Sequence, residues 1–171
     1  GTFRAPEGSS ALTLGDSVTI AVTRPEHQQG DLGIDKERAD AVILKRGPRA
    51  TALCRPQPRG GKRRGGAEVG AFEKVIAANM DMLVIVSATR KPAMRPGLID
   101  RFLIIAERGE LHPVLAVNKI DLDSPDPAKL AHFEELGVEM VYCSAATGQG
   151  LETLRSRLSC GKSIFAGASG V

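Results

Sequence analysis

Apolar runs and helical repeats alternate along the second half of the sequence. Residues 82–86 form a continuous apolar run of the length typical of a buried strand, and residues 114–117 form another. Between them, apolar residues recur at helical spacing after Pro96 and Gly97, and Gly109 is placed to end that helix. The pattern predicts a strand, a helix and a second strand in succession.

The same alternation continues to the last residue. Pro127 follows Asp126, a good N-cap, so a second helix is expected to begin there. A strand-like run over residues 138–145 comes next, then a short helix with an apolar face over residues 151–158, and then a strand over residues 162–166. Four strands separated by three helices predict an α/β fold with a parallel sheet and covering helices.

The first part of the sequence has a β-rich pattern. Residues 14–22 are typical of a turn followed by a strand, and residues 39–44 of a short strand. The polar residues 25–36 between them predict an exposed hairpin loop. We therefore divide the chain into a small β module with a basic linker over residues 1–70 and an α/β domain over residues 71–171.

The apolar run that ends at Val117 leads directly into Asn118-Lys119-Ile120-Asp121. A carboxylate at Asp121 can accept two hydrogen bonds from the N1–H and the exocyclic amine of guanine, whereas adenine would leave it unpaired. Asn118 would bridge neighbouring loops and the base, and the aliphatic stem of Lys119 would cover the base plane. A surface turn that contains these letters by chance is the alternative, and four residues alone do not decide between the two.

Two later segments favour a guanine-nucleotide site. Ser144, Ala145 and Ala146 follow a strand, at the place where GTPases set a backbone N–H against the O6 atom of guanine. The sequence then closes with a strand and the opening of a P-loop, whose final Gly-Lys-Ser/Thr would lie beyond the last residue. The residues of this opening are Gly167, Ala168, Ser169, Gly170 and Val171. A glycine-rich turn there lets successive backbone N–H groups point at phosphate oxygens.

A dinucleotide-binding domain is the obvious competitor for a strand followed by glycines. It is disfavoured because no G-x-G-x-x-G follows the first strand of the α/β part. The three motifs all leave the carboxyl ends of strands, so we expect them to converge on one crevice.

The order of the motifs is unusual. Ordinary GTPases place the P-loop first, whereas here Asn-Lys-x-Asp comes first, Ser-Ala second and the P-loop third, as in a circularly permuted GTPase. Together with residues 79–88 and 100–103, this order resembles the RsgA (YjeQ) family of ribosome small-subunit-dependent GTPases. The resemblance implies that residues 1–70 form an OB-fold-like β-barrel, incomplete in this chain, and that residues 71–171 are part of a circularly permuted P-loop GTPase domain.

The resemblance also implies a function. Proteins of this family bind GTP or GDP with Mg²⁺, contact ribosomal RNA and hydrolyse GTP during late maturation of the small (30S) ribosomal subunit. We expect a cytoplasmic monomer. The carboxyl-terminal zinc module of the family, which would bind Zn²⁺ through Cys and His, is not in this sequence, so no metal ligand is assigned.

No catalytic residue is assigned either. The P-loop lysine, the Ser/Thr that holds Mg²⁺ and the switch loops would all lie beyond the last residue. We therefore expect the parent protein to be the GTPase, and residues 1–171 alone to be a fragment without turnover. Two alternatives stay open, namely a ribosomal-RNA-binding module without hydrolytic activity and a permuted GTPase of large-subunit assembly.

Positive charge is concentrated in one segment of the chain. The net charge is +3, yet residues 41–67 contain no acidic residue and hold eight of the basic ones. These are Lys45, Arg46, Arg49, Arg55, Arg59, Lys62, Arg63 and Arg64. Such a glycine-rich basic segment suits a phosphate backbone, and the partner of the resembled family favours RNA binding over the alternative of a solvated linker.

The remaining composition argues against a membrane protein, a disulfide-rich protein and a metal-binding protein. With 42% apolar and 25% charged residues, the sequence is of the soluble globular kind. No apolar run approaches a membrane span and no signal peptide opens the sequence, so no membrane partner is expected. The three cysteines and three histidines are scattered, which argues against a disulfide framework or a metal site.

Overall fold

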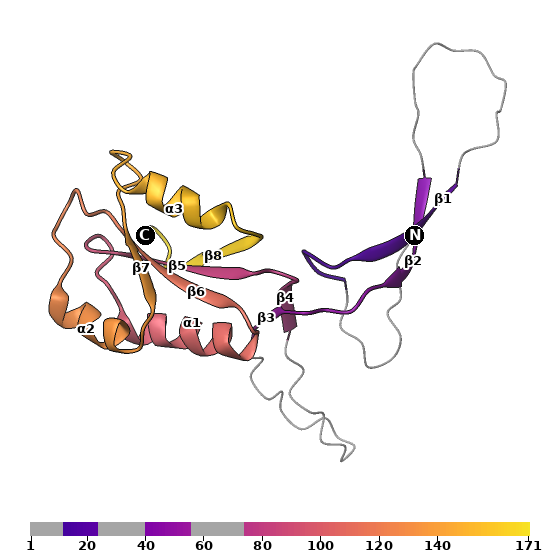
Figure 1. Cartoon of the computed structure of the whole chain (residues 1–171), viewed down its shortest axis with the longest axis horizontal. Coiled ribbons are helices and arrows are strands. Elements are labelled where there is room, and N and C mark those ends of the chain that lie inside the picture. Colours follow the sequence, from indigo (N-terminus) through magenta and orange to yellow (C-terminus); the bar gives the residue numbers. More distant parts are fainter. Residues whose placement is uncertain (1–11, 24–39, 56–73) are drawn as a thin grey trace, which may run out of the picture.

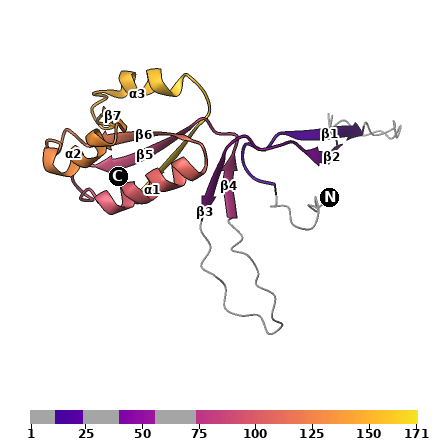
Figure 2. The ribbon, with the colours of Figure 1, turned by 60° about the horizontal axis from the view of Figure 1, so that its bottom comes forward.

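The computed structural model describes residues 12–23, 40–55 and 74–171. Within these residues, the chain forms one four-stranded parallel sheet with helices on both faces and two separate two-stranded antiparallel sheets (Figures 1 and 2). The predicted α/β class with a parallel sheet is confirmed. None of the described helices has the length and apolar character that a bilayer crossing requires.

The strands of the parallel sheet are β5 (Met82–Ala88), β6 (His112–Asn118), β7 (Glu139–Tyr142) and β8 (Ser163–Gly167). Their order is β7-β6-β5-β8, so the chain steps outward from β5 and then returns to the other side of that strand. Val84 of β5 accordingly lies opposite Val114 of β6 and Phe165 of β8. In open α/β sheets, ligands bind at the carboxyl edge where the strand order reverses, which is here between β5 and β8.

The helices of the α/β part are α1 (Pro96–Arg108), α2 (Pro127–Glu135) and α3 (Leu151–Leu158). α1 and α2 cover one face of the sheet and α3 covers the other (Figure 1). The predicted helix signals are confirmed, since α1 is followed by Gly109 as its C-cap and Asp126 accepts a hydrogen bond from the backbone N–H of Ala128 at 3.1 Å.

The core of the α/β part lies between the sheet and the helices α1 and α2. Its most buried members, each at most 2% exposed, are Leu83, Ile85, Ile99, Ala106, Leu115, Val117, Leu130 and Phe133. Burying a side chain of the size of leucine or phenylalanine contributes about 1.5–3 kcal/mol. The predicted apolar face of α3 is only half-buried, and none of its residues belongs to this core.

Two hairpins precede the parallel sheet. In one, β1 (Val18–Thr23) pairs with β2 (Asp40–Arg46), and in the other, β3 (Ala52–Arg55) pairs with β4 (Lys74–Ala78). The alternating pattern predicts β1 and β2 but neither β3 nor β4. β3 lies inside the basic segment and is only four residues long, too short to show alternation.

The described strands of these hairpins form two separate sheets. The predicted loop over residues 25–36 lies outside the described residues, so the OB-fold-like barrel remains a prediction. The division at residue 70 also remains a prediction, although β4 lies after it and pairs with β3 before it. Ala77 of β4 and Leu53 of β3 both join the core beside α1.

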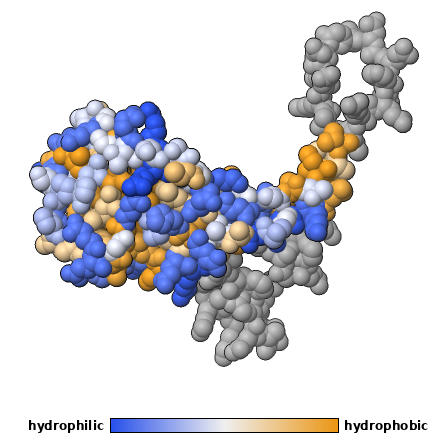
Figure 3. Space-filling view, viewed as in Figure 1, coloured by the Kyte–Doolittle hydropathy of each residue, from blue (hydrophilic) through white to orange (hydrophobic). Residues whose placement is uncertain are grey.

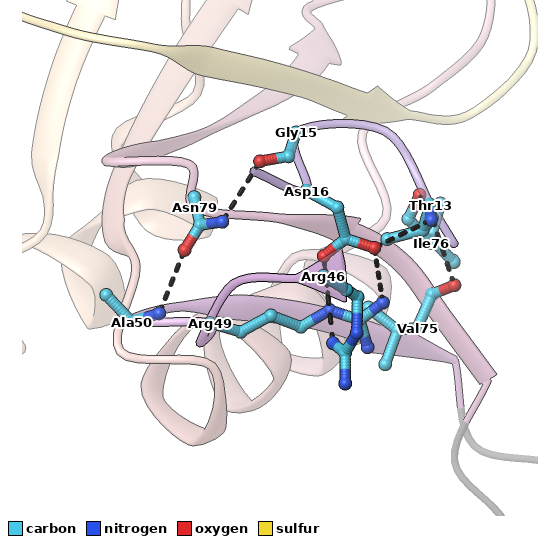
Figure 4. A network of polar contacts seen from close by, with 9 residues as sticks. All are labelled: Thr13, Gly15, Asp16, Arg46, Arg49, Ala50, Val75, Ile76 and Asn79. Carbon is cyan, nitrogen blue, oxygen red and sulfur yellow. Dashed lines mark hydrogen bonds and ion pairs between the residues drawn. The ribbon is translucent and has the colours of Figure 1, made fainter. Parts of the chain in front are cut away.

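A network of polar contacts joins the two hairpins (Figure 4). The side chain of Asp16 is 2% exposed and receives two hydrogen bonds from Arg49, from Nε to Oδ1 and from Nη2 to Oδ2, each at 2.6 Å. The backbone N–H of Thr13 donates to Oδ2 at 2.9 Å, and Nη1 of Arg46 lies 3.8 Å from Oδ1. The hydrogen bonds from Arg49, together with that from Thr13, lower the pKa of Asp16 because they stabilise its charged form.

Asn79 extends this network toward the parallel sheet. Its Nδ2 donates to the carbonyl of Gly15 at 3.0 Å, and its Oδ1 accepts a hydrogen bond from the N–H of Ala50 at 2.9 Å. Its φ of 54° lies in the left-handed region, where asparagine is among the better tolerated residues. One side chain therefore connects the segment before β1 to the segment before β3.

Candidate functional site

Three loops at the carboxyl edge of the sheet meet at Asn118, the last residue of β6, which is 9% exposed. Its carbonyl accepts a hydrogen bond from the N–H of Thr89 at 3.1 Å, and its Oδ1 accepts one from the N–H of Ala145 at 3.0 Å. Because Thr89 follows β5 and Ala145 follows β7, one asparagine holds three neighbouring loops together. Its contact with a base remains a prediction.

Asp121 is exposed and lies beside Ser144, which is completely buried. The hydroxyl of Ser144 donates to Oδ1 of Asp121 at 2.5 Å and accepts a hydrogen bond from the N–H of Thr147 at 3.2 Å. No other described residue hydrogen-bonds to the Asp121 carboxylate, so its second oxygen keeps its full capacity to accept. A carboxylate that a buried hydroxyl holds in one orientation is preorganised for N–H donors.

Lys119 connects this loop to two others. Its ammonium donates to the backbone carbonyls of Lys91 and Gly170, and its own carbonyl accepts a hydrogen bond from Oγ1 of Thr89 at 2.7 Å. Lys91 follows β5 and Gly170 follows β8. Lys119 therefore bridges the place where the strand order reverses, with its stem fixed at both ends.

The predicted P-loop opening follows β8. A Cβ atom on Gly167 would lie 2.4 Å from the carbonyl oxygen of Val86, so only glycine allows β8 to lie this close to β5. Gly170 has a φ of 80°, and the N–H of Val171 donates to the carbonyl of Ala168 at 3.4 Å. The segment is thus a glycine-dependent turn at the carboxyl edge, as a phosphate loop requires.

The remaining predicted ligand residues are Ala145, Ala146 and Ser169. Ala146 and Ser169 are exposed, while the N–H of Ala145 is engaged with Asn118. The hydrogen bond from this loop to the O6 atom of guanine remains a prediction. All three of the motifs found in the sequence lie at the carboxyl edge of the sheet, on the loops after β6, β7 and β8.

The sequence motifs leave out two residues of this site, Thr89 and Lys91. Both lie after β5, and both bond to the Asn118–Lys119 turn. Their position could have identified them, because the residues that follow any buried parallel strand reach the same edge of the sheet as the other ligand loops.

Cys143 lies between β7 and Ser144 and is buried. Burial raises the pKa of its thiol, because the thiolate would lose its solvation there. Its Sγ is 4.0 Å from Oδ1 of Asn118. Among the described residues, no group of three or more His, Cys, Asp or Glu side chains is arranged to hold a metal ion.

The structure divides the predicted RNA-binding residues into three groups. Lys45 and Arg55 are exposed. Arg49 is committed to Asp16, as is Arg46 at a longer distance, so Arg49 is better explained as a structural residue than as a phosphate ligand. The other four, which are Arg59, Lys62, Arg63 and Arg64, lie outside the described residues.

Comparison with known proteins agrees with this geometry. The model of the family described as RsgA GTPase matches residues 47–171, which include the second hairpin and the whole parallel sheet. The chain belongs to the RsgA GTPase family. The predicted family is therefore confirmed.

Similar proteins carry the name small ribosomal subunit biogenesis GTPase RsgA. One from Pseudomonas putida is 40% identical over 166 residues, which are 94% of this chain and 41% of that protein. One from Chlorobaculum tepidum is 35% identical over 173 residues, which cover 100% of this chain and 51% of the relative. The chain thus spans about half or less of the length of the RsgA proteins that it matches.

Two solved structures share the fold. YjeQ from Thermotoga maritima is 28% identical with a TM-score of 0.60, and the match covers 94% of this chain and 48% of that one. YloQ, a circularly permuted GTPase, gives a TM-score of 0.58 at 19% identity, with coverage of 96% and 48%. The fold of this RsgA chain is therefore that of the circularly permuted GTPases.

Proposed function

We propose that this chain is the guanine-binding part of a GTPase that acts in the biogenesis of the small ribosomal subunit. The observation that supports it best is the hydrogen bond from the buried Ser144 to Asp121, beside a lysine that bridges the loops after β5 and β8. The name that the RsgA relatives share supports the same activity.

Base selection follows from the chemistry of Asp121. Its free oxygen and the remaining lone pair of Oδ1 can accept the N1–H and the exocyclic amine of guanine. Adenine offers neither donor at these positions and would leave a fixed carboxylate unpaired, which costs about 1–3 kcal/mol or more. The stem of Lys119, held at its ammonium, would pack on the base plane.

The phosphates would lie on the turn after β8. Successive N–H groups there would point at phosphate oxygens, and in P-loop GTPases the Ser/Thr of the same motif and the phosphates themselves hold Mg²⁺. Hydrolysis of GTP belongs to the whole protein in this proposal. The protein would work as a cytoplasmic monomer that contacts the ribosomal RNA of the small subunit through its basic segment.

The test is a change of base preference in the variant Asp121→Asn. An amide at this position can donate where the carboxylate accepts, so it should disfavour guanine and favour xanthine, which carries a carbonyl in place of the exocyclic amine. We expect the affinity for GDP to fall by about 100-fold, as the loss of two charge-assisted hydrogen bonds implies, and the affinity for XDP to rise. Equilibrium titration with fluorescent GDP, with unlabelled GDP, XDP and ADP as competitors, measures this.

A matched control is Asp123→Asn, which makes the same chemical change two residues away on an exposed side chain. It should leave the preference for GDP over ADP as in the wild-type protein. Unchanged GDP affinity in Asp121→Asn, or equal competition by GDP and ADP in the wild-type protein, would contradict the proposed base site.

A further inference from the structure

Asp121 lies in a tight turn that follows β6. The N–H of Leu122 donates to the carbonyl of Lys119 at 2.9 Å, and this bond closes a turn of four residues with Asp121 in its third position. We call residues 119–122 the Asp121 turn. Because the closing bond ends on the carbonyl of Lys119, the position of Asp121 depends on how that carbonyl is held.

The carbonyl of Lys119 accepts a second hydrogen bond, from a half-buried side chain on the loop after β5. Oγ1 of Thr89 donates to it at 2.7 Å, and the N–H of Thr89 donates to the preceding carbonyl, that of Asn118, at 3.1 Å. A carbonyl oxygen has two lone pairs, so it can accept from Thr89 and from Leu122 at the same time. Thr89 thus holds the two successive carbonyls at which β6 ends and the Asp121 turn begins.

The backbone at the start of the Asp121 turn has a conformation that its surroundings must maintain. Lys119 has a φ of 62°, in the left-handed region that lysine seldom adopts, and such a conformation persists where neighbouring contacts fix it. The last pair of residues between β5 and β6 is Ala88 with Asn118. The hydroxyl of Thr89 reaches one residue beyond this pair, so it extends the support of the sheet into the turn.

We propose that Thr89 is a positioning residue for guanine recognition, which acts by holding the Asp121 turn through its hydroxyl. The carboxylate of Asp121 is then fixed in two ways, directly by the hydroxyl of Ser144 at 2.5 Å and through the backbone of its turn by Thr89. Two hydrogen bonds to one base require a fixed orientation of the carboxylate, because each bond weakens steeply as its angle departs from linearity. This inference rests on the proposed function, since it takes Asp121 as the acceptor of the N1–H and the exocyclic amine of guanine.

A hydroxyl with a purely structural role would behave differently, and Thr51 offers the comparison. Its hydroxyl donates to the carbonyl of Met80 at 2.5 Å, a bond between the segment before β3 and the segment before β5. Removal of either hydroxyl takes one donor from a backbone carbonyl and should lower the melting temperature. Removal of the Thr89 hydroxyl should in addition change the choice between bases, because it loosens the turn that carries Asp121.

The test is the choice of the full-length protein between GDP and inosine diphosphate (IDP). The base of IDP keeps the N1–H of guanine and lacks the exocyclic amine, so the ratio of the two affinities reports on the second hydrogen bond to Asp121. We expect the wild-type protein to bind GDP about tenfold more tightly than IDP. In Thr89→Val, which keeps the shape of the side chain and removes the hydroxyl, the affinity for GDP should fall about tenfold and the preference for GDP over IDP should fall to about twofold.

Thr89→Ser tests whether the hydroxyl is the group responsible. It keeps a donor at the same position, so we expect the affinity for GDP and the preference over IDP to stay within about threefold of the wild-type values. Competition against fluorescent GDP measures the affinities, and thermal unfolding shows that each variant is folded.

The matched control is Thr51→Val, which makes the same chemical change away from the carboxyl edge. It should keep the wild-type preference and bind GDP within about twofold of the wild-type affinity. The inference is wrong if Thr89→Val keeps the wild-type preference, if Thr89→Ser loses it, or if Thr51→Val loses it to the same extent as Thr89→Val. A failure of the proposed function would appear in the wild-type protein itself, as equal competition by GDP and ADP, and would overturn this inference with it.

Discussion

Asp16 and Arg49 form the least exposed ion pair among the described residues. Their side chains are 2% and 11% exposed, and the guanidinium meets the carboxylate with two parallel hydrogen bonds. Breaking such a pair leaves a buried charge without a partner, which is much more costly than losing a surface pair. Their role is therefore to fix the segment before β1 against the segment before β3.

We predict that Arg49→Met lowers the free energy of unfolding by about 3 kcal/mol at pH 7. Because the pKa of Asp16 is lowered in the folded protein, its contribution to stability is present above its ordinary pKa of 3.8 and is lost as the pH falls through the lowered folded value. In the variant, the free energy of unfolding should therefore decrease less as the pH is lowered. Urea unfolding at a series of pH values from 7 to 2 measures both effects.

The control for this prediction is Arg155→Met, which removes the partner of Glu152 from a pair whose side chains are 77% and 84% exposed. Its effect should stay within about 0.5 kcal/mol, as for most exposed pairs. Equal losses in the two variants would show that the Asp16 pair does not stabilise the fold.

At the residue scale, the sequence predicts what a side chain could bind better than it predicts which other residues the side chain contacts. Asn118, Lys119 and Asp121 could be selected as candidates because recognition of guanine requires these groups at this spacing, and their contact with a base stays a prediction. The pairing of Arg49 with Asp16 could not be predicted, because the two residues are 33 positions apart and lie on the separate segments before β1 and before β3. A count of basic residues treats a buried arginine and an exposed one alike.

At the scale of elements, β5 and β8 are in unusually close contact at Gly167. The elements of the parallel sheet could be predicted because their strands are continuously apolar and their helices are capped and periodic. β3 and β4 could not be predicted, because these strands are stabilised by pairing with each other and by the packing of Leu53 and Ala77 beside α1. The contact at Gly167 likewise depends on the backbone of β5.

We predict that Gly167→Ala separates β8 from β5 and disturbs the turn that follows. The added Cβ would lie 2.4 Å from the carbonyl oxygen of Val86, and overpacking of this kind costs about 1–3 kcal/mol. GDP affinity should fall as well, because the predicted phosphate turn begins at this residue. Thermal unfolding and GDP titration measure the two effects.

Gly97→Ala is the matched control for this change. A Cβ at Gly97 would have no atom within 4 Å, and the residue lies in the first turn of α1. We expect unchanged or slightly higher stability there. A wild-type melting temperature in Gly167→Ala would contradict the close contact between β8 and β5.

At the scale of the whole molecule, the described residues are packed unevenly. The strands β5 and β6 are buried beneath the helices, whereas the hairpin β1–β2 exposes apolar side chains, as Figure 3 shows. They include Ile20, Val22, Val42 and Leu44, each between 49% and 61% exposed. An isolated two-stranded hairpin is only marginally stable in water.

We therefore predict unequal protection of backbone amides in native-state hydrogen exchange. Amides of β5 and β6 should exchange more slowly than those of β1 and β2 by about two orders of magnitude or more, because only the former need the core to open. The exchange should be followed by mass spectrometry in the absence of nucleotide. Equal protection would mean that the hairpin is as firmly packed as the parallel sheet.

The strand order also has a consequence for how the protein is made. β5 is central in the sheet, yet its neighbour β8 comes much later, since Asp81 and Lys162 at their amino ends are 81 residues apart. Translation at about 5–20 residues per second leaves one edge of β5 open for roughly 4–16 s on the nascent chain. An apolar strand edge left open is a template for wrong pairing, so any pause in synthesis before residue 163 prolongs the time at risk of aggregation.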